Sequence, residues 1–339
     1  MRIGIDASRA LLRRRTGIEE YSYRVIEHLR NEIPNETVTL YVPKRLVFEG
    51  GRLHFVLPAI DFEIPKMWKV KGLWAPRFWT QIRLSLEMIL SPVNVLFVPA
   101  HTVPLFHPKR TIVTIHGLEY EFSPESYGFL ARLYMRYSIR YSVLMAKQVI
   151  AVSENTKQDL IRLYNVPEEK IRVIYEGFTR KEPDQLSRVK MGKPYFFFVG
   201  RLETRKNIIR IIEAFERFKD GTGLSHELIL AGKPGYGYEM IEGRIRASKY
   251  KEDIQEVGYV SEEERWRYLK GAEAFLFPSL YEGFGLPVID AQSIGVPVIT
   301  SNSSSLPEIA GDGAVFIDPM NPQALAEAMS EVVKNPVKR

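Results

Sequence analysis

Short runs of consecutive apolar residues alternate along this chain with longer amphipathic segments, and no other feature restricts the fold as strongly. Three such runs are YFFFV at 195–199, ELILA at 227–231 and AFLF at 274–277. A strand that is apolar at every position is buried on both faces, which is typical of a parallel sheet covered by helices. The alternation therefore predicts an α/β protein in which helices connect the strands of parallel sheets.

The expected elements follow this pattern through both halves of the chain. Strands are expected at residues 3–6, 37–42, 95–98, 111–115, 149–151, 172–174, 195–199, 227–231, 254–257, 274–277, 297–299 and 314–317. Helices are expected at residues 17–29, 127–146, 154–163, 206–218, 261–269, 286–293 and 323–333. Ser153 is a natural N-cap for the helix that begins at residue 154.

A polar stretch at residues 176–193, just before the apolar run YFFFV, divides the pattern into two halves. Because 339 residues suffice for two domains, we expect an N-terminal domain at 1–176, a linker at 177–193 and a C-terminal domain at 194–339. In open α/β sheets ligands bind beyond the carboxyl ends of the strands. Two such sheets would place these ends on either side of a cleft.

Composition narrows the function classes. With 45% apolar and 12% aromatic residues, the chain can bury a large core and is expected to be globular. The lack of cysteine excludes a disulfide framework, a thiolate nucleophile and a cysteine-ligated zinc. The net charge of +6 suits an acidic ligand, an anionic membrane or nucleic acid without distinguishing them. No signal peptide or membrane-spanning helix is recognisable, so a cytoplasmic location is expected.

One candidate loop, at residues 200–207, reads GRLETRKN and joins a strong strand to a helix. Gly200 lets the backbone approach a ligand closely, and the positive charges of Arg201 and Lys206 add to that of the helix N-terminus. The loop can be interpreted as a diphosphate site. Alternatively, Arg201 and Lys206 are solvated surface charges.

A second loop, at residues 281–290, reads YEGFGLPVID and places two acids around two glycines. Glu282 and Asp290 would repel phosphate but can accept hydrogen bonds from hydroxyls, so they fit a sugar better. N–H groups near Gly283 and Gly285 could bind ligand oxygens, and Pro287 suits the first turn of a helix. Alternatively, Glu282 caps that helix and Asp290 is a solvated helix residue.

Two histidines follow apolar strands. His116 stands at a strand end in TIVTIHGLEY (111–120), where ligand-facing residues lie in open α/β sheets, and Glu119 could orient it or the substrate. His101 is a weaker candidate of the same kind, and a structural role is the alternative for a lone histidine. Gly17 lies on the loop between the first strand and the first helix, beside the basic run at 13–15.

In this order along one chain, these segments resemble a known family over nearly the whole length. The chain is similar to retaining glycosyltransferases of family 4, which have the GT-B fold of two Rossmann-like domains facing a central cleft. The resemblance rests on TIHGLEYEFSPE (114–125), IAVSENTKQDLIRLYNVPEEKIRVIYEGF (150–178), VGRLETRKN (199–207) and EGFGLPVIDAQSIGVPVIT (282–300). The first of these is written as in bacterial mannosyltransferase-like members.

The resemblance implies a role for each candidate. Arg201 and Lys206 would bind the diphosphate of the donor, and Asp290 its ribose. His116 would contact the donor sugar and help to stabilise the transition state, while Gly17 would let its loop close on the diphosphate. The transferred sugar would be held by Glu282, Gly283, Phe284, Gly285 and Leu286.

The implied reaction moves a hexose of the mannose or glucose type from a nucleoside-diphosphate sugar, with retention by front-face displacement. No cofactor or metal is expected, because basic side chains can stabilise the leaving group and the chain has no Asp-x-Asp motif. GDP-mannose is the first donor expected, with UDP- and ADP-sugars as alternatives.

Three features depart from the family pattern. Asp290 stands where relatives usually have glutamate, which has a longer reach toward the ribose. Glu19 and Glu20 lie where relatives often carry glycine or a basic residue, and they would be unfavourable beside a diphosphate unless they point away. The chain stops at Arg339, where relatives commonly continue with a helix that crosses back to the N-terminal domain.

The acceptor is encoded less clearly. Between Lys66 and Arg83 the sequence reads KMWKVKGLWAPRFWTQIR, with three of the four tryptophans and no acid. This composition suits contact with the inner face of a membrane, and the acceptor would then be a lipid-linked saccharide. Alternatively, these aromatic residues lie in the core and the acceptor is a soluble glycan. Arg132, Arg136 and Arg140 recur at helical spacing and could extend a basic face.

Two rival functions are compatible with parts of the sequence. One is a sugar-nucleotide epimerase-like enzyme of the same fold, which would bind a diphosphate without an acceptor. The other is a non-catalytic polyanion binder, which only the net charge favours. Nucleic acid is not an expected partner, because the sequence carries no nucleic-acid-binding motif.

Overall fold

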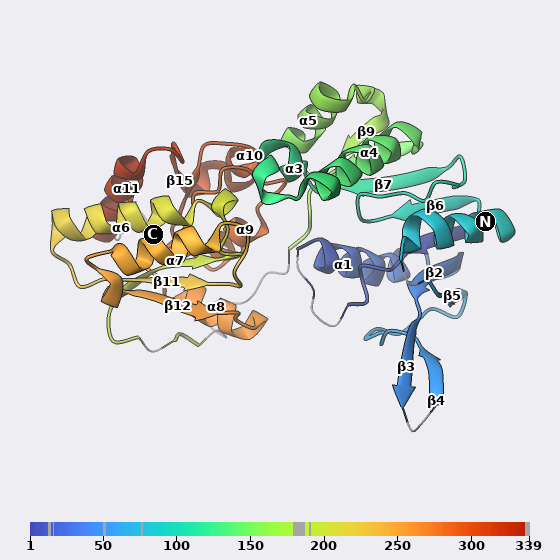
Figure 1. Cartoon of the computed structure of the whole chain (residues 1–339), viewed down its shortest axis with the longest axis horizontal. Coiled ribbons are helices and arrows are strands. Elements are labelled where there is room, and N and C mark those ends of the chain that lie inside the picture. Colours follow the sequence, from blue (N-terminus) through green and yellow to red (C-terminus); the bar gives the residue numbers. More distant parts are fainter. Residues whose placement is uncertain are drawn as a thin grey trace. The chain divides into compact units, whose positions relative to one another are not determined.

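The computed structural model describes residues 1–12, 15, 17–49, 52–75, 77–178, 187–189 and 191–335. The chain forms two compact units (Figure 1). Unit 1 comprises Met1–Leu118 and Phe129–Gly177, and unit 2 comprises Glu119–Gly128 and Phe178–Arg339. Within the linker expected at 177–193, residues 179–186 and 190 lie outside the described residues, as do Arg13 and Arg14.

Unit 1 is built on a parallel sheet whose strand order reverses beside its first strand. In spatial order the strands are β5 (Trp68–Leu73), β2 (Thr37–Pro43), β1 (Arg2–Asp6), β6 (Val95–Val98), β7 (Thr111–Ile115), β8 (Gln148–Ala151) and β9 (Ile171–Val173). Its α-helices are α1 (Gly17–Glu32), α2 (Ser85–Leu90), α4 (Phe129–Met145) and α5 (Glu154–Tyr164). As predicted, Ser153 caps α5, since its hydroxyl accepts a hydrogen bond from the Thr156 N–H.

A hairpin of β3 (Arg45–Glu49) and β4 (Arg52–Val56) forms a separate antiparallel pair and projects from unit 1 (Figure 1).

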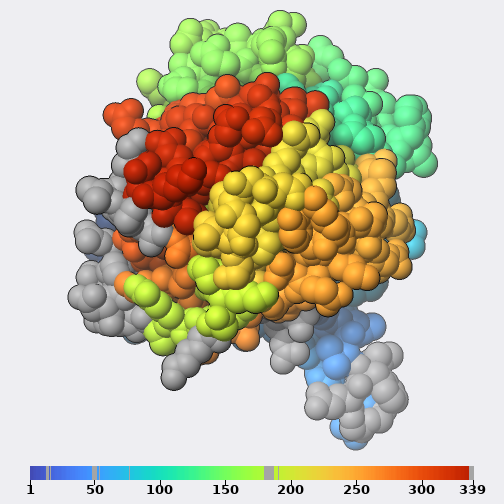
Figure 2. Space-filling view, turned by 90° about the vertical axis from the view of Figure 1, so that its left-hand side faces the viewer, coloured from blue at the N-terminus to red at the C-terminus, as the bar shows by residue number. Residues whose placement is uncertain are grey.

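Unit 2 contains a second parallel sheet with the same reversal. In spatial order its strands are β12 (Ile254–Gly258), β11 (Glu227–Ala231), β10 (Tyr195–Val199), β13 (Ala274–Phe277), β14 (Val298–Ser301) and β15 (Ala314–Ile317). Its α-helices are α3 (Glu119–Phe122), α6 (Ile208–Thr222), α7 (Tyr238–Ala247), α8 (Glu262–Gly271), α9 (Leu286–Ser293), α10 (Leu306–Ala310) and α11 (Pro322–Lys334). The helices α11, α6 and α7 lie side by side on one face of the unit (Figures 1 and 2).

Burial explains why the apolar runs predicted these sheets. Phe196, Phe197 and Phe198 are consecutive in β10, so their side chains point to alternate faces, and all three are fully buried. Both faces of the sheet are therefore covered, as expected for a parallel α/β sheet. The predicted fold class of parallel sheets in two Rossmann-like halves is confirmed.

Two helices start two residues later than the sequence pattern predicted, and α8 starts one residue later, at Glu262. The helix expected from residue 206 begins at Ile208, because Asn207 has a φ of 63° and interrupts the helical backbone. The helix expected from residue 127 begins at Phe129, because the backbone of Tyr127 is extended, with a φ of -129° and a ψ of 133°.

The aromatic stretch between Lys66 and Arg83 divides between core and surface. Trp68 is buried in β5, the edge strand beside β2, whereas Trp74 and Phe78 are exposed. No helix in the described parts of the chain is long and apolar enough to cross a membrane.

Candidate active site

The two loops singled out in the sequence follow neighbouring strands of unit 2. β10 and β13 pair in parallel where the strand order reverses, and the loops at 200–207 and 278–285 follow their carboxyl ends. Ligands of open α/β sheets bind in the crevice at this reversal, because adjacent loops there diverge to opposite faces of the sheet. The topology thus brings Lys206 and Glu282 to one edge although 76 residues separate them.

The loop after β10 is held against the next loop by backbone contacts. Gly200 has a φ of 156°, and its N–H donates to the Ala231 carbonyl. A side chain on Gly232 would place its Cβ 1.7 Å from the Gly200 oxygen, so only glycine fits this approach. Asn207 is buried, and its side-chain amide donates to the carbonyls of Pro278 and Pro319. This amide joins the basic loop to the end of β13.

The acidic loop is positioned by serines and a glycine. The Ser305 hydroxyl hydrogen-bonds the carbonyls of Glu282 and Phe284, and the Glu282 N–H donates to the Ser304 hydroxyl. Gly285 has a φ of 122° and leads directly into α9, which begins at Leu286. The loop conformation is therefore fixed by contacts with the segment before α10.

The two loops meet through charge. Lys206 Nζ lies 2.5 Å from Glu282 Oε1, and Arg205 Nη1 lies 3.4 Å from Glu282 Oε2. Burial would raise the pKa of Glu282, but Lys206 and Arg205 outweigh it and hold this pKa below its usual value. Arg201 is exposed and stands outside this buried cluster.

Arg205 is a central residue that the sequence reasoning missed. Its guanidinium donates one hydrogen bond to the Tyr281 carbonyl at 2.6 Å and another to the Glu203 carboxylate at 2.9 Å. It therefore fixes both loops at once. Burial would lower its pKa, but the nearby charges of Glu282, Glu119 and Glu203 raise it. Its place between Arg201 and Lys206 in the basic motif was the available signal.

A short segment from the first half of the chain packs onto this cluster. Phe122 stacks on Tyr281 with ring centroids 4.2 Å apart and an interplanar angle of 14°. Burial, followed by the charge of Glu119, raises the pKa of Tyr127 to about 12. Glu119, expected to orient His116 or the substrate, thus lies in the electrostatic surroundings of Arg205 within unit 2.

The second acid of the predicted pair has a different partner. Asp290 is buried on α9, and its Oδ2 lies 3.0 Å from Nη1 of Arg265 on α8. Asp290 lies eight residues after Glu282 in the chain. Because its partner is Arg265, its charge belongs to an ion pair separate from that of Lys206 and Glu282. Arg265 carried no motif that could have identified it.

His116 is buried at the end of β7 in unit 1. Its Nδ1 lies 2.8 Å from Glu176 Oε1, and its Nε2 lies 2.9 Å from the Pro99 carbonyl oxygen. Because a carbonyl only accepts hydrogen bonds, Nε2 is a donor there. Tyr21 contacts the ring edge-to-face at 4.5 Å. Both nitrogens of His116 are thus bonded within unit 1.

His101 lies beside His116, with ring centroids 5.3 Å apart. It has a φ of 31°, and its buried Nδ1 has no hydrogen-bond partner among the described residues. Burial, then the charges of His116 and Arg9, lowers the pKa of His101 to about 3. This imidazole is neutral at physiological pH.

The first turn of α1 carries two acids, Glu19 and Glu20, and both lie in ion pairs. Glu20 lies 2.8 Å from Arg15 and 2.7 Å from Arg24, and Glu19 lies 3.6 Å from Arg9. These arginines offset the negative charge of the two carboxylates, which from the sequence alone were expected to be unfavourable near a diphosphate. A Cβ added to Gly17, the first residue of α1, would have no atom of the described residues within 4 Å.

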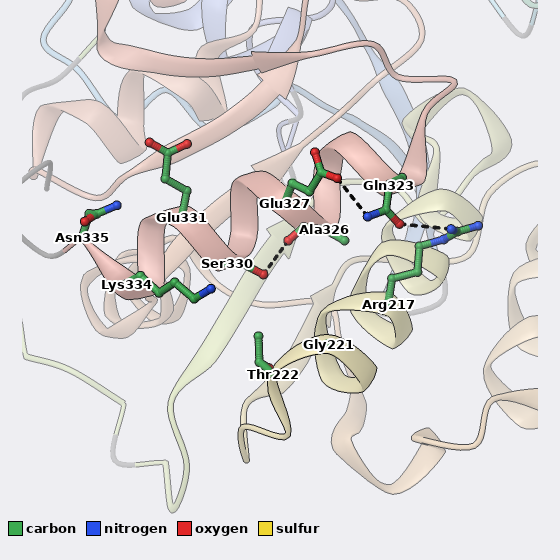
Figure 3. Close-up of a pocket in the computed structure, with 10 residues that line it drawn as sticks. All are labelled: Arg217, Gly221, Thr222, Gln323, Ala326, Glu327, Ser330, Glu331, Lys334 and Asn335. Carbon is green, nitrogen blue, oxygen red and sulfur yellow. Dashed lines mark hydrogen bonds between the residues drawn. The ribbon is translucent and has the colours of Figure 1, made fainter.

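A hollow of about 410 Å³ lies elsewhere in unit 2, between α6 and α11 (Figure 3). Its lining residues on α6 are Arg217, Gly221 and Thr222, near the end of the helix opposite Lys206. It is therefore separate from the paired loops. Within the described ranges, no three histidine, aspartate or glutamate side chains are grouped so as to hold a metal ion.

Models of two protein families together match residues 15–339 of the chain. The model described as "Glycosyltransferase Family 4" matches residues 15–181, and the one described as "Glycosyl transferases group 1" matches residues 179–339. The junction falls close to the division between the two units.

Two relatives are mannosyltransferases by name. The chain is 30% identical over 227 residues to O-antigen chain mannosyltransferase B of Escherichia coli, covering 64% of this chain and 60% of the relative. It is 25% identical over 324 residues to O-antigen chain mannosyltransferase RfbU of Salmonella typhimurium, covering 95% of this chain and 88% of the relative. The first match thus spans less than two thirds of that relative.

Solved structures show the same fold. Sucrose-phosphate synthase from Thermosynechococcus elongatus aligns with a TM-score of 0.73 at 18% identity, over all of this chain and 91% of the other. The glycosyltransferase WaaG aligns with a TM-score of 0.72 at 14% identity, over all of this chain and 92% of the other. The fold is GT-B, and the epimerase-like and polyanion-binding alternatives give way to a transferase. Together the two models show that the chain belongs to the glycosyltransferases, with the family 4 match in its first half and the group 1 match in its second half.

Proposed function

We propose that this enzyme transfers a hexose from a nucleoside-diphosphate sugar to a saccharide hydroxyl with retention of the anomeric configuration. The observation that carries the proposal is the meeting of Lys206 and Glu282 where the strand order of unit 2 reverses. An ammonium group suits phosphate oxygens, and a carboxylate suits sugar hydroxyls. One short segment therefore offers partners for both parts of a sugar diphosphate.

The proposed roles follow from this chemistry. Lys206 binds the diphosphate and exchanges its contact with Glu282 for phosphate oxygens, and the exposed Arg201 adds a second cation at the mouth of the loop. Glu282 and the N–H groups of residues 283–286 hold sugar hydroxyls. Arg205 positions both loops. Asp290 reaches the ribose only if it shares its carboxylate with Arg265.

The proposed step breaks the bond between the anomeric carbon and the diphosphate oxygen. The acceptor oxygen forms its bond to that carbon on the same face, and the departing phosphate takes the acceptor proton. Lys206 stabilises the charge that develops on the diphosphate. The contact between His116 and the sugar, the closing of the Gly17 loop and the independence from metal remain predictions from the family resemblance.

For the donor we propose GDP-mannose first, with UDP- and ADP-sugars as alternatives. The names of the two mannosyltransferase relatives support mannose. A structural neighbour, Anabaena HepE, was solved with UDP-glucose and aligns with a TM-score of 0.69 at 14% identity, which supports a nucleotide sugar.

For the acceptor we propose a glycan, either soluble or lipid-linked, with the reaction at the inner face of the membrane in the second case. The structural neighbour WaaG is described as involved in lipopolysaccharide biosynthesis, which supports the lipid-linked form.

A thermal-shift panel of GDP, UDP, ADP, dTDP and their sugars, without metal, tests the donor site. A ligand that binds only the folded state raises Tm according to its concentration relative to Kd. We expect one nucleoside diphosphate to exceed the others, with its shift lost in Lys206→Ala. Lys193→Ala is the matched control, because Lys193 precedes β10 at the opposite sheet edge and pairs with Asp253 at 2.6 Å. The absence of any shift would refute the proposed site.

A further inference from the structure

The longest helix of unit 1 exposes its apolar side. In α4, Phe129 and Leu130 are each 77% exposed and Tyr137 is 64% exposed. Leu133 and Tyr134 complete two rows at four-residue spacing on the same face, and both are exposed. The opposite side of α4 packs inward through Ile139, Ser142 and Val143. The helix is therefore amphipathic, but its solvent-facing side is the apolar one.

The neighbouring loop extends this surface. The Tyr141 hydroxyl donates a hydrogen bond of 2.6 Å to the Leu105 carbonyl, and the Ser142 hydroxyl accepts one from the Val103 N–H. These bonds hold Leu105 and Phe106 beside α4, and both side chains are more than half exposed. An apolar area of this kind on the surface of a folded unit marks a docking surface.

Charge indicates what docks there. The helix FLARLYMRYSIRYSVLM contains three arginines and no acid, and Arg136 and Arg140 are exposed. Apolar and aromatic residues bordered by arginine are typical of helices that lie in the interface of an anionic membrane. A second copy of the chain fits less well, since a two-fold contact through α4 would bring these arginines against their own copies.

We infer that the face of α4 formed by Phe129, Leu130, Leu133, Tyr134 and Tyr137, with Leu105 and Phe106, docks onto an anionic lipid surface. The helix has 17 residues and is about 25 Å long, so it would lie along the surface. This inference goes beyond the proposed reaction, and it differs from the membrane contact expected between Lys66 and Arg83, where Trp68 is buried in the sheet.

Co-sedimentation of the purified full chain with vesicles tests the inference. We expect binding to phosphatidylglycerol-containing vesicles, weaker binding to pure phosphatidylcholine and further weakening as salt is raised. The double variant Leu130→Gln/Leu133→Gln should lose affinity by about tenfold or more, because two apolar side chains no longer enter the lipid interface. The matched control, Trp74→Gln/Phe78→Gln, changes two exposed apolar residues of the 66–83 segment and should bind as the wild type does.

Three outcomes would overturn the inference: no binding by the wild type, unchanged binding by the α4 variant, or a wild-type dimer in light scattering that this variant dissociates. The last would assign the face to self-association. Nucleotide thermal shifts should be equal in wild type and α4 variant. A missing nucleotide shift in both would refute the donor site and leave the vesicle result standing.

Discussion

Lys206 and Glu282, 76 residues apart, are bound to each other at 2.5 Å in the buried junction of two loops. The pair explains how a lysine and a carboxylate are kept in a largely buried site, because each offsets part of the desolvation cost of the other. It also means that removal of either partner leaves a buried charge with less compensation.

Lys206→Ala should reduce kcat/KM for the donor by about 100-fold or more, because a cation at the leaving diphosphate is lost. Glu282→Ala should likewise abolish transfer. Donor titration by calorimetry and initial rates measure both effects, with Lys193→Ala as the exposed-lysine control. Near-normal turnover in either variant would place the site elsewhere.

Phe122→Ala should disturb the acidic loop from a distance. The stack on Tyr281 is lost, which should lower the free energy of unfolding of unit 2 by about 0.5–1.5 kcal/mol. Because the Tyr281 carbonyl is held by Arg205, we also expect a higher KM for the donor with a smaller change in kcat. Phe122→Tyr preserves the ring and should restore both. A lower stability with unchanged KM would limit Phe122 to a structural role.

His116→Ala should lower turnover more than it lowers donor affinity, if the ring contacts the sugar in the transition state. Glu176→Gln keeps the shape of its partner and removes the charge, so its effect on kcat should be smaller. Single-turnover rates and donor Kd values separate the two steps. Unchanged turnover in His116→Ala would make this histidine structural.

His101 should make the fold sensitive to mild acid. Its pKa is about 3 in the folded protein and about 6.5 when unfolded, so between these values the unfolded chain binds one more proton. The stability due to this group is complete above about pH 6.5 and declines as pH falls toward 3.

The test compares Tm across this pH range in wild type and His101→Asn. Asparagine tolerates the positive φ of this position. As pH falls, the Tm of the wild type should decrease more than that of the variant. Parallel plots of Tm against pH would contradict the lowered pKa of His101.

Gly232→Ala should destabilise unit 2 by about 3 kcal/mol or more, because the new Cβ meets the Gly200 carbonyl where the backbone is already left-handed. Gly221→Ala is the control: it lies in α6 with open space around it and should stabilise by about 0.5–1 kcal/mol. Denaturant unfolding measures both. Equal changes in the free energy of unfolding for the two variants would show that the close approach of Gly232 to the Gly200 carbonyl does not require glycine.

The apolar pattern was enough to determine much of the fold. The bounds of β10, β11, β13, β15 and α9 agree with the predicted ranges. A run that is apolar on both faces can only be satisfied between two layers of helices, so local sequence suffices there. The edge strand β5 and the β3–β4 hairpin were missed, since strands at an edge or outside a sheet need no continuous apolar run.

The candidate site divides in the same way. The sequence by itself determined which loops carry charge, because glycines, basic residues and acids next to apolar strands are a local signal. Only the tertiary structure decided that Lys206 pairs with Glu282, that Asp290 pairs with Arg265, and that Phe122 stacks on Tyr281. These partners are far apart in the chain and meet through strand order and loop packing. Their pairing depends on distances in the folded protein, which no local pattern of residues encodes.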